Sequence, residues 1–202
     1  MVRSPFEYRF CFPDMAVLLA CLLLGLHPQT GASGELLETP AATPSEFSLQ
    51  DLSGQIHSLG DFGGRVILIN FWASWCRPCI AEMPAIQRLA GALQGRPFVV
   101  LAINVGESRR RVQAATRRLG IGFPVLLDKD NAVFESWRAS VLPAARVIDC
   151  RGKIRYRAEG PIEWDRAEII ATLQALAAEG CGRPSTRPPA AVQQATKGAI
   201  NQ

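Results

Sequence analysis

The chain has 202 residues, of which 48% are apolar and 20% charged, and its net charge is +4. These values are typical of one soluble globular domain with short appendages. The densest arginine clusters, 109–111 and 117–118, fall in one predicted helix whose opposite face is apolar. A solvated helix face explains them better than a nucleic-acid-binding surface, so we expect no nucleic-acid partner.

The first residues have the pattern of an export signal. An apolar run from Met15 to Leu26 follows two arginines, and no further Lys or Arg occurs before Arg65. The run is short for a membrane span but suits the core of a signal peptide. We therefore expect residues 1–32 to be a signal peptide or an N-terminal membrane anchor, with lipidation at Cys21 as an alternative. The body of the protein would then be exported and would touch the membrane only through this segment.

Residues 33–45 contain Pro, Gly, Ala, Ser and Thr and are predicted to be a linker. Short alternating segments on either side of the turn at Asp51–Gly54 predict a β-hairpin. Residues 66–72 are almost continuously apolar and rich in β-branched side chains, which is typical of a central strand covered on both faces. An amphipathic helix follows, and then a second buried strand at 98–105.

The same patterns predict the elements of the second half. These are a basic helix from Ser108, a strand at 123–127, a short helix at 132–138, two strands with charged alternate positions at 146–149 and 153–157, and a last helix from Asp165 to Gly180. The charged alternate positions suit the edge of a sheet. Strands that alternate with helices predict an α/β domain over residues 46–180 with a mainly parallel sheet. Residues 181–202 are predicted to be a disordered tail.

Cys76 and Cys79 stand where the predicted central strand gives way to a helix, and Arg77 and Pro78 separate them. A structural zinc site would need a second such pair, and haem attachment would need a histidine in place of Ile80. A purely structural bridge would close a loop too short to constrain the unfolded chain much. The pattern is best explained by a redox-active dithiol.

The position of each cysteine indicates its role. Cys76 is expected at a helix N-terminus, where free backbone N–H groups, the helix dipole and Arg77 stabilise a thiolate, so it is the predicted nucleophile. Cys79 lies one turn further along, on the same side and better shielded, as a resolving thiol should be. In the expected reaction Cys76 attacks a disulfide and Cys79 resolves the mixed disulfide.

The sequence INFWASWCRPC, followed by IAEMP, resembles the thioredoxin superfamily and within it the exported TlpA/ResA-like branch, which includes the reductases of cytochrome c maturation. The resemblance extends from about Glu46 to Glu179. It implies a thioredoxin-like fold in which helices flank a central mixed sheet, with an N-terminal β-hairpin and an insertion before the cis-proline. It also implies a periplasmic location, client-protein disulfides as substrates and a membrane thiol protein as electron donor. No cofactor and no metal are expected.

The resemblance also implies roles around the dithiol. VLPAARVID occupies the position of the cis-proline loop, so Pro143 would face the dithiol and Leu142 would bind the backbone of the client. Trp75, Arg77 and Pro78 would support the site. Val141 and Ala144 replace the glycine and the small hydroxyl residue that are usual near this proline, which bears on client preference.

Glu82 is the candidate proton acceptor. Where thioredoxin has a buried aspartate on the central strand, this chain has Asn70, whereas Glu82 stands three residues after Cys79 on the same helix face. The TlpA/ResA-like branch carries a glutamate here, and the resemblance implies that it assists proton transfer. A partly apolar pocket beside Trp75 and Pro143 would raise its pKa toward neutrality. The alternative is an ordinary solvated glutamate.

Two other functions fit parts of the pattern. A copper- or haem-handling chaperone could use the same thiols as ligands, but Met83 is the only additional ligand nearby. A peroxiredoxin-like peroxidase would need Pro and Thr or Ser where Ile69 and Ala73 stand. The direction of electron flow depends on the reduction potential, which the two intervening residues do not determine.

Cys150 and Cys181 would be the only other cysteines left after removal of the leader. In an oxidising compartment they could bridge the sheet and the end of the last helix, or they could remain free thiols.

Overall fold

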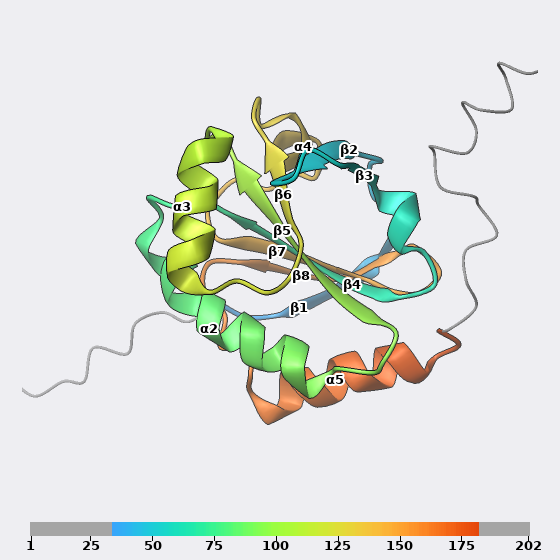
Figure 1. The fold of residues 1–202 in the computed structure, drawn as a ribbon. Helices are drawn as coiled ribbons and strands as arrows, with labels where there is room; N and C mark the ends of the chain where they lie inside the picture. The colour runs from blue at the N-terminus through green and yellow to red at the C-terminus, as the bar shows by residue number, and fades with distance from the viewer. Residues whose placement is uncertain (1–33, 182–202) are drawn as a thin grey trace, which may run out of the picture. The chain divides into compact units, whose positions relative to one another are not determined.

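The computed structural model describes residues 34–181, so the expected signal peptide or anchor at 1–32 and the tail after residue 181 lie outside the described residues. Helices flank both faces of an eight-stranded mixed sheet, whose strand order is β1-β8-β7-β4-β5-β6-β2-β3 (Figure 1). At its centre, β4 (Val66–Trp72), β5 (Phe98–Val105) and β6 (Val125–Asp128) run parallel. Among the described helices, none is long and apolar enough to cross a membrane.

The remaining strands pair antiparallel. They are β1 (Leu37–Ala42), β2 (Ser48–Asp51), β3 (Ile56–Ser58), β7 (Ala144–Ile148) and β8 (Ile154–Glu159). The helices are η1 (Leu59–Phe62), a 3-10 turn, and α2 (Arg77–Ala92), α3 (Arg109–Leu119), α4 (Ala132–Ser136) and α5 (Ala167–Ala178). The predicted hairpin is β2–β3, and α3, β6 and α4 fill the segment between β5 and the proline loop.

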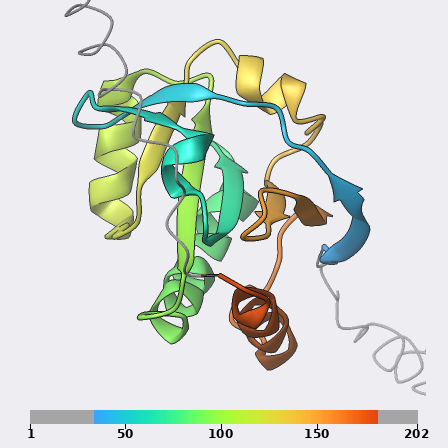
Figure 2. The same ribbon diagram turned by 90° about the vertical axis from the view of Figure 1, so that its right-hand side faces the viewer.

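The central strand β4 divides the core into two layers because successive side chains of a strand point to opposite faces. Its even-numbered apolar residues, such as Leu68 and Trp72, pack in one cluster with α2, α3 and α5, and its odd-numbered residues pack in the other with η1 and α4. Every residue of β4 is buried, as predicted for a strand covered on both faces. On the first face α2 and α5 lie side by side (Figure 1 and Figure 2).

The expected linker at 33–45 is wrong in one respect, because it contains strand β1. This strand pairs antiparallel with β8, with Leu37 opposite Arg157. Most of its residues are exposed and it includes Pro40, which an edge strand tolerates because one row of its backbone groups faces solvent. The strands predicted at 146–149 and 153–157 correspond to β7 and β8, and neither is at the sheet edge. β7 lies between β4 and β8, and β8 lies between β7 and β1.

The last helix also begins later than predicted. Asp165 is not its N-cap, because the helix starts at Ala167 with Arg166 as the N-cap residue. Asp165 instead accepts a hydrogen bond from Arg88 of α2 at 2.6 Å, and Arg88 holds its pKa below the usual range. A contact between α2 and the turn before α5 replaces the local capping box.

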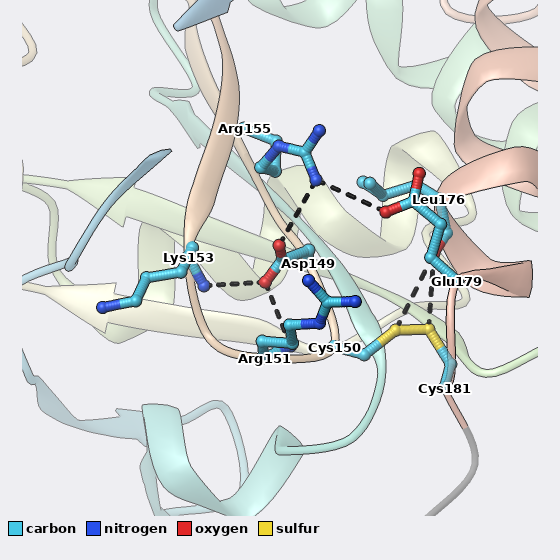
Figure 3. Close-up of a disulfide and its surroundings, with 8 residues drawn as sticks. All are labelled: Asp149, Cys150, Arg151, Lys153, Arg155, Leu176, Glu179 and Cys181. Carbon is cyan, nitrogen blue, oxygen red and sulfur yellow. Dashed lines mark hydrogen bonds and ion pairs between the residues drawn. A yellow bond between two sulfur atoms is a disulfide. The ribbon is translucent and has the colours of Figure 1, made fainter. Parts of the chain in front are cut away.

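A second disulfide joins Cys150, in the β7–β8 turn, to Cys181, just after α5 (Figure 3). The two Cα atoms are 5.2 Å apart, within the usual range for a disulfide. Arg155 links the same parts of the chain by charge, since its Nη1 lies 3.5 Å from carboxylate oxygens of both Asp149 and Glu179. The bridge and the ion pairs together fasten α5 to the sheet.

We expect loss of the second bridge to lower stability without affecting the fold. The bridge spans 31 positions, so the loop-entropy model gives about 3 to 4 kcal/mol for a Cys150→Ala/Cys181→Ala variant. Urea unfolding of the oxidised proteins measures this difference. Mass spectrometry after alkylation without reduction provides the control, and two labelled cysteines at these positions in the wild-type protein would contradict the bridge.

Candidate active site

Cys76 and Cys79 lie where β4 passes through a short loop into α2. They form a disulfide, with Cα atoms 5.3 Å apart, and Cys76 is the N-cap residue of α2. The backbone N–H of Cys79 donates to the Cys76 sulfur at 3.3 Å. Cys76 keeps 5% exposure and Cys79 has none. A thiolate on Cys76 would therefore be stabilised by a directed N–H group and by the positive end of the helix dipole.

The residues next to the dithiol are accessible. Arg77 and Pro78 are exposed, and the Trp75 side chain is 68% exposed, although it is large and apolar. Pro78 stands in the first turn of α2, where the helix needs no N–H from it. Arg77 is a cationic residue adjacent to Cys76 in the chain, and Trp75 presents an apolar surface to solvent.

The Pro143 loop reaches the same end of β4. The Leu142–Pro143 peptide bond is cis. Ala144 of β7 pairs with Phe71 of β4 in the antiparallel ladder. Pro143, the residue before Ala144, therefore lies at the level of Trp72, close to the start of the dithiol loop. Its carbonyl oxygen accepts a hydrogen bond from Gly160 N–H at 2.8 Å. Pro143 is buried and Leu142 is half-buried.

Glu82 is buried beneath this surface, with 5% exposure. One carboxylate oxygen accepts a hydrogen bond from Asn70 Nδ2 of β4 at 2.7 Å, and the other accepts from the backbone N–H of Ile162 at 3.1 Å. The pocket differs from the expected one, because Trp75 points into solvent and the polar partners come from β4 and the segment before α5. The alternative of a solvated glutamate is wrong.

Burial raises the pKa of Glu82 from 4.5 to about 7, because the charged form loses its hydration, although the hydrogen bonds from Ile162 and Asn70 oppose this rise. Folded protein therefore holds this proton more tightly than unfolded protein does. The contribution to stability is complete below pH 4.5 and is lost as the pH rises through about 7. At neutral pH the group can both take and release a proton.

Glu107, which was not predicted from the sequence, holds the dithiol loop from the end of the neighbouring strand β5. It is 5% exposed and accepts hydrogen bonds from Ser74 N–H at 2.6 Å, Ser74 Oγ at 2.6 Å and Asn104 Nδ2 at 2.8 Å. Burial alone would raise the pKa of Glu107, but the hydrogen bonds from Asn104 and Ser74, with the charge of Arg111, lower it below the usual value. Glu107 follows β5, and the carboxyl ends of adjacent parallel strands lie at the same edge of a sheet. A polar residue just after β5 could therefore have been predicted to lie near the dithiol loop that follows β4.

Arg146, a buried arginine on β7, was likewise not predicted from the sequence. Its guanidinium donates to the carbonyl oxygens of Trp137 and Arg138 at 3.3 and 3.1 Å and forms an ion pair with Glu159 at 2.8 Å. These bonds fix the end of α4, from which the chain continues to Leu142 and Pro143. Glu107 and Arg146 thus hold the two loops that lead to the site. Within residues 34–181 no group of three or more His, Cys, Asp or Glu side chains could hold a metal ion.

The fold and the disulfide at the start of α2 define a thioredoxin-like thiol-disulfide oxidoreductase domain. Residues 41–157 match the model of the AhpC/TSA family, and the chain belongs to that family. The match covers more than half of the chain.

Relatives and a solved structure agree with this assignment. The thiol-disulfide oxidoreductase ResA of Bacillus subtilis (strain 168) is 31% identical over 140 residues, covering 69% of this chain and 78% of that protein. ResA of Geobacillus thermodenitrificans (strain NG80-2) is 36% identical over 114 residues, covering 56% of this chain and 66% of its length. A thiol:disulfide interchange protein of the thioredoxin family from Chlorobium tepidum TLS superposes with a TM-score of 0.59, at 23% identity, over 68% of this chain and 99% of that one. The last likeness establishes the fold alone.

Proposed function

We propose that the protein is an exported reductase of disulfides in client proteins and that it acts through Cys76 and Cys79. The observation that carries the proposal is the Cys79 N–H directed at the Cys76 sulfur at the start of α2. This geometry favours a thiolate on the more accessible cysteine, which is the nucleophile that thiol–disulfide exchange requires.

The reaction proceeds in two balanced steps. The Cys76 thiolate attacks one sulfur of the client disulfide, so a Cys76–client bond forms, the client bond breaks and the released client thiolate takes up a proton. Cys79 then loses its proton and attacks the Cys76 sulfur, which forms the Cys76–Cys79 bond and releases the second client thiolate. Two electrons pass to the client, and the enzyme reaches the oxidised state that the structure contains. A membrane thiol protein would return it to the dithiol.

Glu82 accepts the proton from Cys79 in the second step. Cys79 has no exposed surface, so its thiolate is disfavoured and bulk water does not reach it directly. Glu82 stands one helical turn further along α2, and Asn70 cannot titrate. A pKa of about 7 is close to the working pH, where a general base is most effective.

Client binding would use the rim of the site. Leu142 and Pro143 would pair with the extended backbone of the client, and the exposed side chains of Trp75 and Val141 would cover its apolar residues. Trp75 is 68% exposed and Val141 47%, and exposed large apolar residues near a reactive group support an interaction surface.

The second disulfide and the dithiol motif support the proposed location and client class. The second disulfide, between Cys150 and Cys181, is typical of proteins that fold in an oxidising compartment, and it supports export to the periplasm. The leader at 1–32 would be cleaved or would anchor the protein. A role in cytochrome c or oxidase maturation is proposed from the resemblance of the dithiol motif alone.

The alternatives gain no support from the site. Met83, the further ligand that a copper- or haem-handling chaperone needs, has no exposed surface, so a partner could not reach it in this conformation. Ile69 and Ala73, which stand at the positions of the peroxidase motif, are completely buried apolar residues.

Replacing each cysteine separately tests the two-step reaction. Cys76→Ser removes the nucleophile, so client reduction should fall to background. Cys79→Ser should form mixed disulfides with clients and fail to release them, because resolution has been removed. Insulin reduction and non-reducing electrophoresis measure the two effects, and full turnover by the Cys79→Ser variant would contradict the mechanism.

Glu82→Gln should slow thiol–disulfide exchange by about 10- to 100-fold, at the modest end of acid–base contributions. The wild-type rate should rise through an inflection near pH 7, where Glu82 ionises, and this inflection should be missing from the variant. Stopped-flow exchange across the range of about pH 5 to 9 measures both effects.

A second readout separates chemistry from packing. Glutamine cannot ionise, so at about pH 8 the variant should be the more stable protein, by up to about 3 kcal/mol, and the difference should vanish below pH 4.5. A variant with wild-type rates and an unchanged pH profile would remove Glu82 from the mechanism.

A further inference from the structure

A hollow of about 630 Å³ opens beside the dithiol loop, between that loop and helix α3. Ser74, two residues before Cys76, forms one wall. The other wall is the exposed face of α3 and includes the side chains of Arg110, Arg111 and Arg118. Three arginines from one helix therefore face a cavity that Ser74 of the dithiol loop also lines.

The charges in this hollow are only partly balanced. Within residues 34–181, the acidic group that forms an ion pair with an arginine of this hollow is Glu107, whose carboxylate lies 3.8 Å from Arg111. That carboxylate already accepts three hydrogen bonds from Ser74 and Asn104. Arg110 and Arg118 are exposed, and within residues 34–181 neither makes a hydrogen bond or an ion pair through its side chain. Arg109 differs, because it donates to Leu52 O and Gln50 Oε1 and so serves the fold. Two uncommitted guanidinium groups are thus left in a hollow that Ser74 of the dithiol loop also lines.

We infer that this positively charged hollow is an anion-binding subsite. It binds a carboxylate of the client close to the client cysteine that forms the mixed disulfide with Cys76. The inference rests on the proposed function. Guanidinium groups pair with carboxylates through two parallel hydrogen bonds, and a positive hollow raises the local concentration of acidic segments. A client with Asp or Glu within a few residues of its disulfide would fill the hollow while its sulfur reaches Cys76.

The test compares two peptides, each with one intramolecular disulfide, that differ only in carrying Glu or Gln beside the cysteines. With the reduced protein, the Glu peptide should react about three- to tenfold faster, the range expected of one or two exposed charge pairs. The preference for the Glu peptide should disappear at an ionic strength of about 1 M, because the Debye length is then about 3 Å and exposed charges are screened. Stopped-flow fluorescence gives the two second-order rate constants.

Matched charge reversals locate the effect. Arg110→Glu/Arg118→Glu should abolish or invert the preference, whereas Arg65→Glu/Arg96→Glu should retain it. Both control arginines are exposed, and each lies just before its strand, Arg65 before β4 and Arg96 before β5. These strand starts are at the end of the sheet away from the dithiol loop, about 20 Å from it at 3.3 Å per residue. The two double variants change the net charge equally, so a general charge effect would lower the preference in both.

A measurement without redox chemistry keeps the two proposals distinguishable. The Glu peptide with serine in place of its cysteines should shift the NMR signals of Ser74, Arg110 and Arg118 in the oxidised protein, and the Gln peptide should not. If neither disulfide peptide is reduced, the proposed function fails, and this binding still decides the subsite. Equal rates for both peptides, or loss of preference in the control variant, would overturn the inference. Binding to anionic phospholipid vesicles through Arg110 and Arg118, without any peptide preference, would also overturn it.

Discussion

The hydrogen bonds of the Glu82 carboxylate join the three parts of the chain that make the redox site. Glu82 belongs to α2, its first partner Asn70 to the central strand and its second partner Ile162 to the segment before α5. Because the carboxylate is buried, its ionised form is expensive, and two N–H donors reduce that cost without removing it. The result is a carboxyl group with a pKa near neutrality, one helical turn after Cys79 of the dithiol.

Two further buried charges place the loops around this group. Glu107 binds Ser74 in the loop before Cys76, and Arg146 binds the end of α4, which precedes Leu142 and Pro143. Their partners are mainly backbone groups and small polar side chains, so each charge is compensated within the protein. The exposed rim, including Trp75, is the part of the site that we propose meets client proteins.

The sequence predicted the features that depend on local patterns. The buried strand at 66–72, the helix after it and the dithiol between them all follow from short-range periodicity and spacing. Strand β1 was missed because its polar, proline-containing sequence becomes a strand only by pairing with β8, more than 100 residues later. Glu107 was missed because Ser74 lies 33 positions away, and the start of α5 because Asp165 is bound by Arg88 of another helix. Long-range partners are not visible in a single sequence.

The reduction potential of the Cys76–Cys79 couple tests the central claim most directly, because a reductase must hold its disulfide form more firmly than its clients hold theirs. Equilibration of the protein with glutathione or dithiothreitol buffers, with alkylation to count the thiols, gives the value. The account predicts a potential more negative than about −200 mV, in the range of glutaredoxins and thioredoxin. A value near about −120 mV, as in strongly oxidising dithiols, would contradict it.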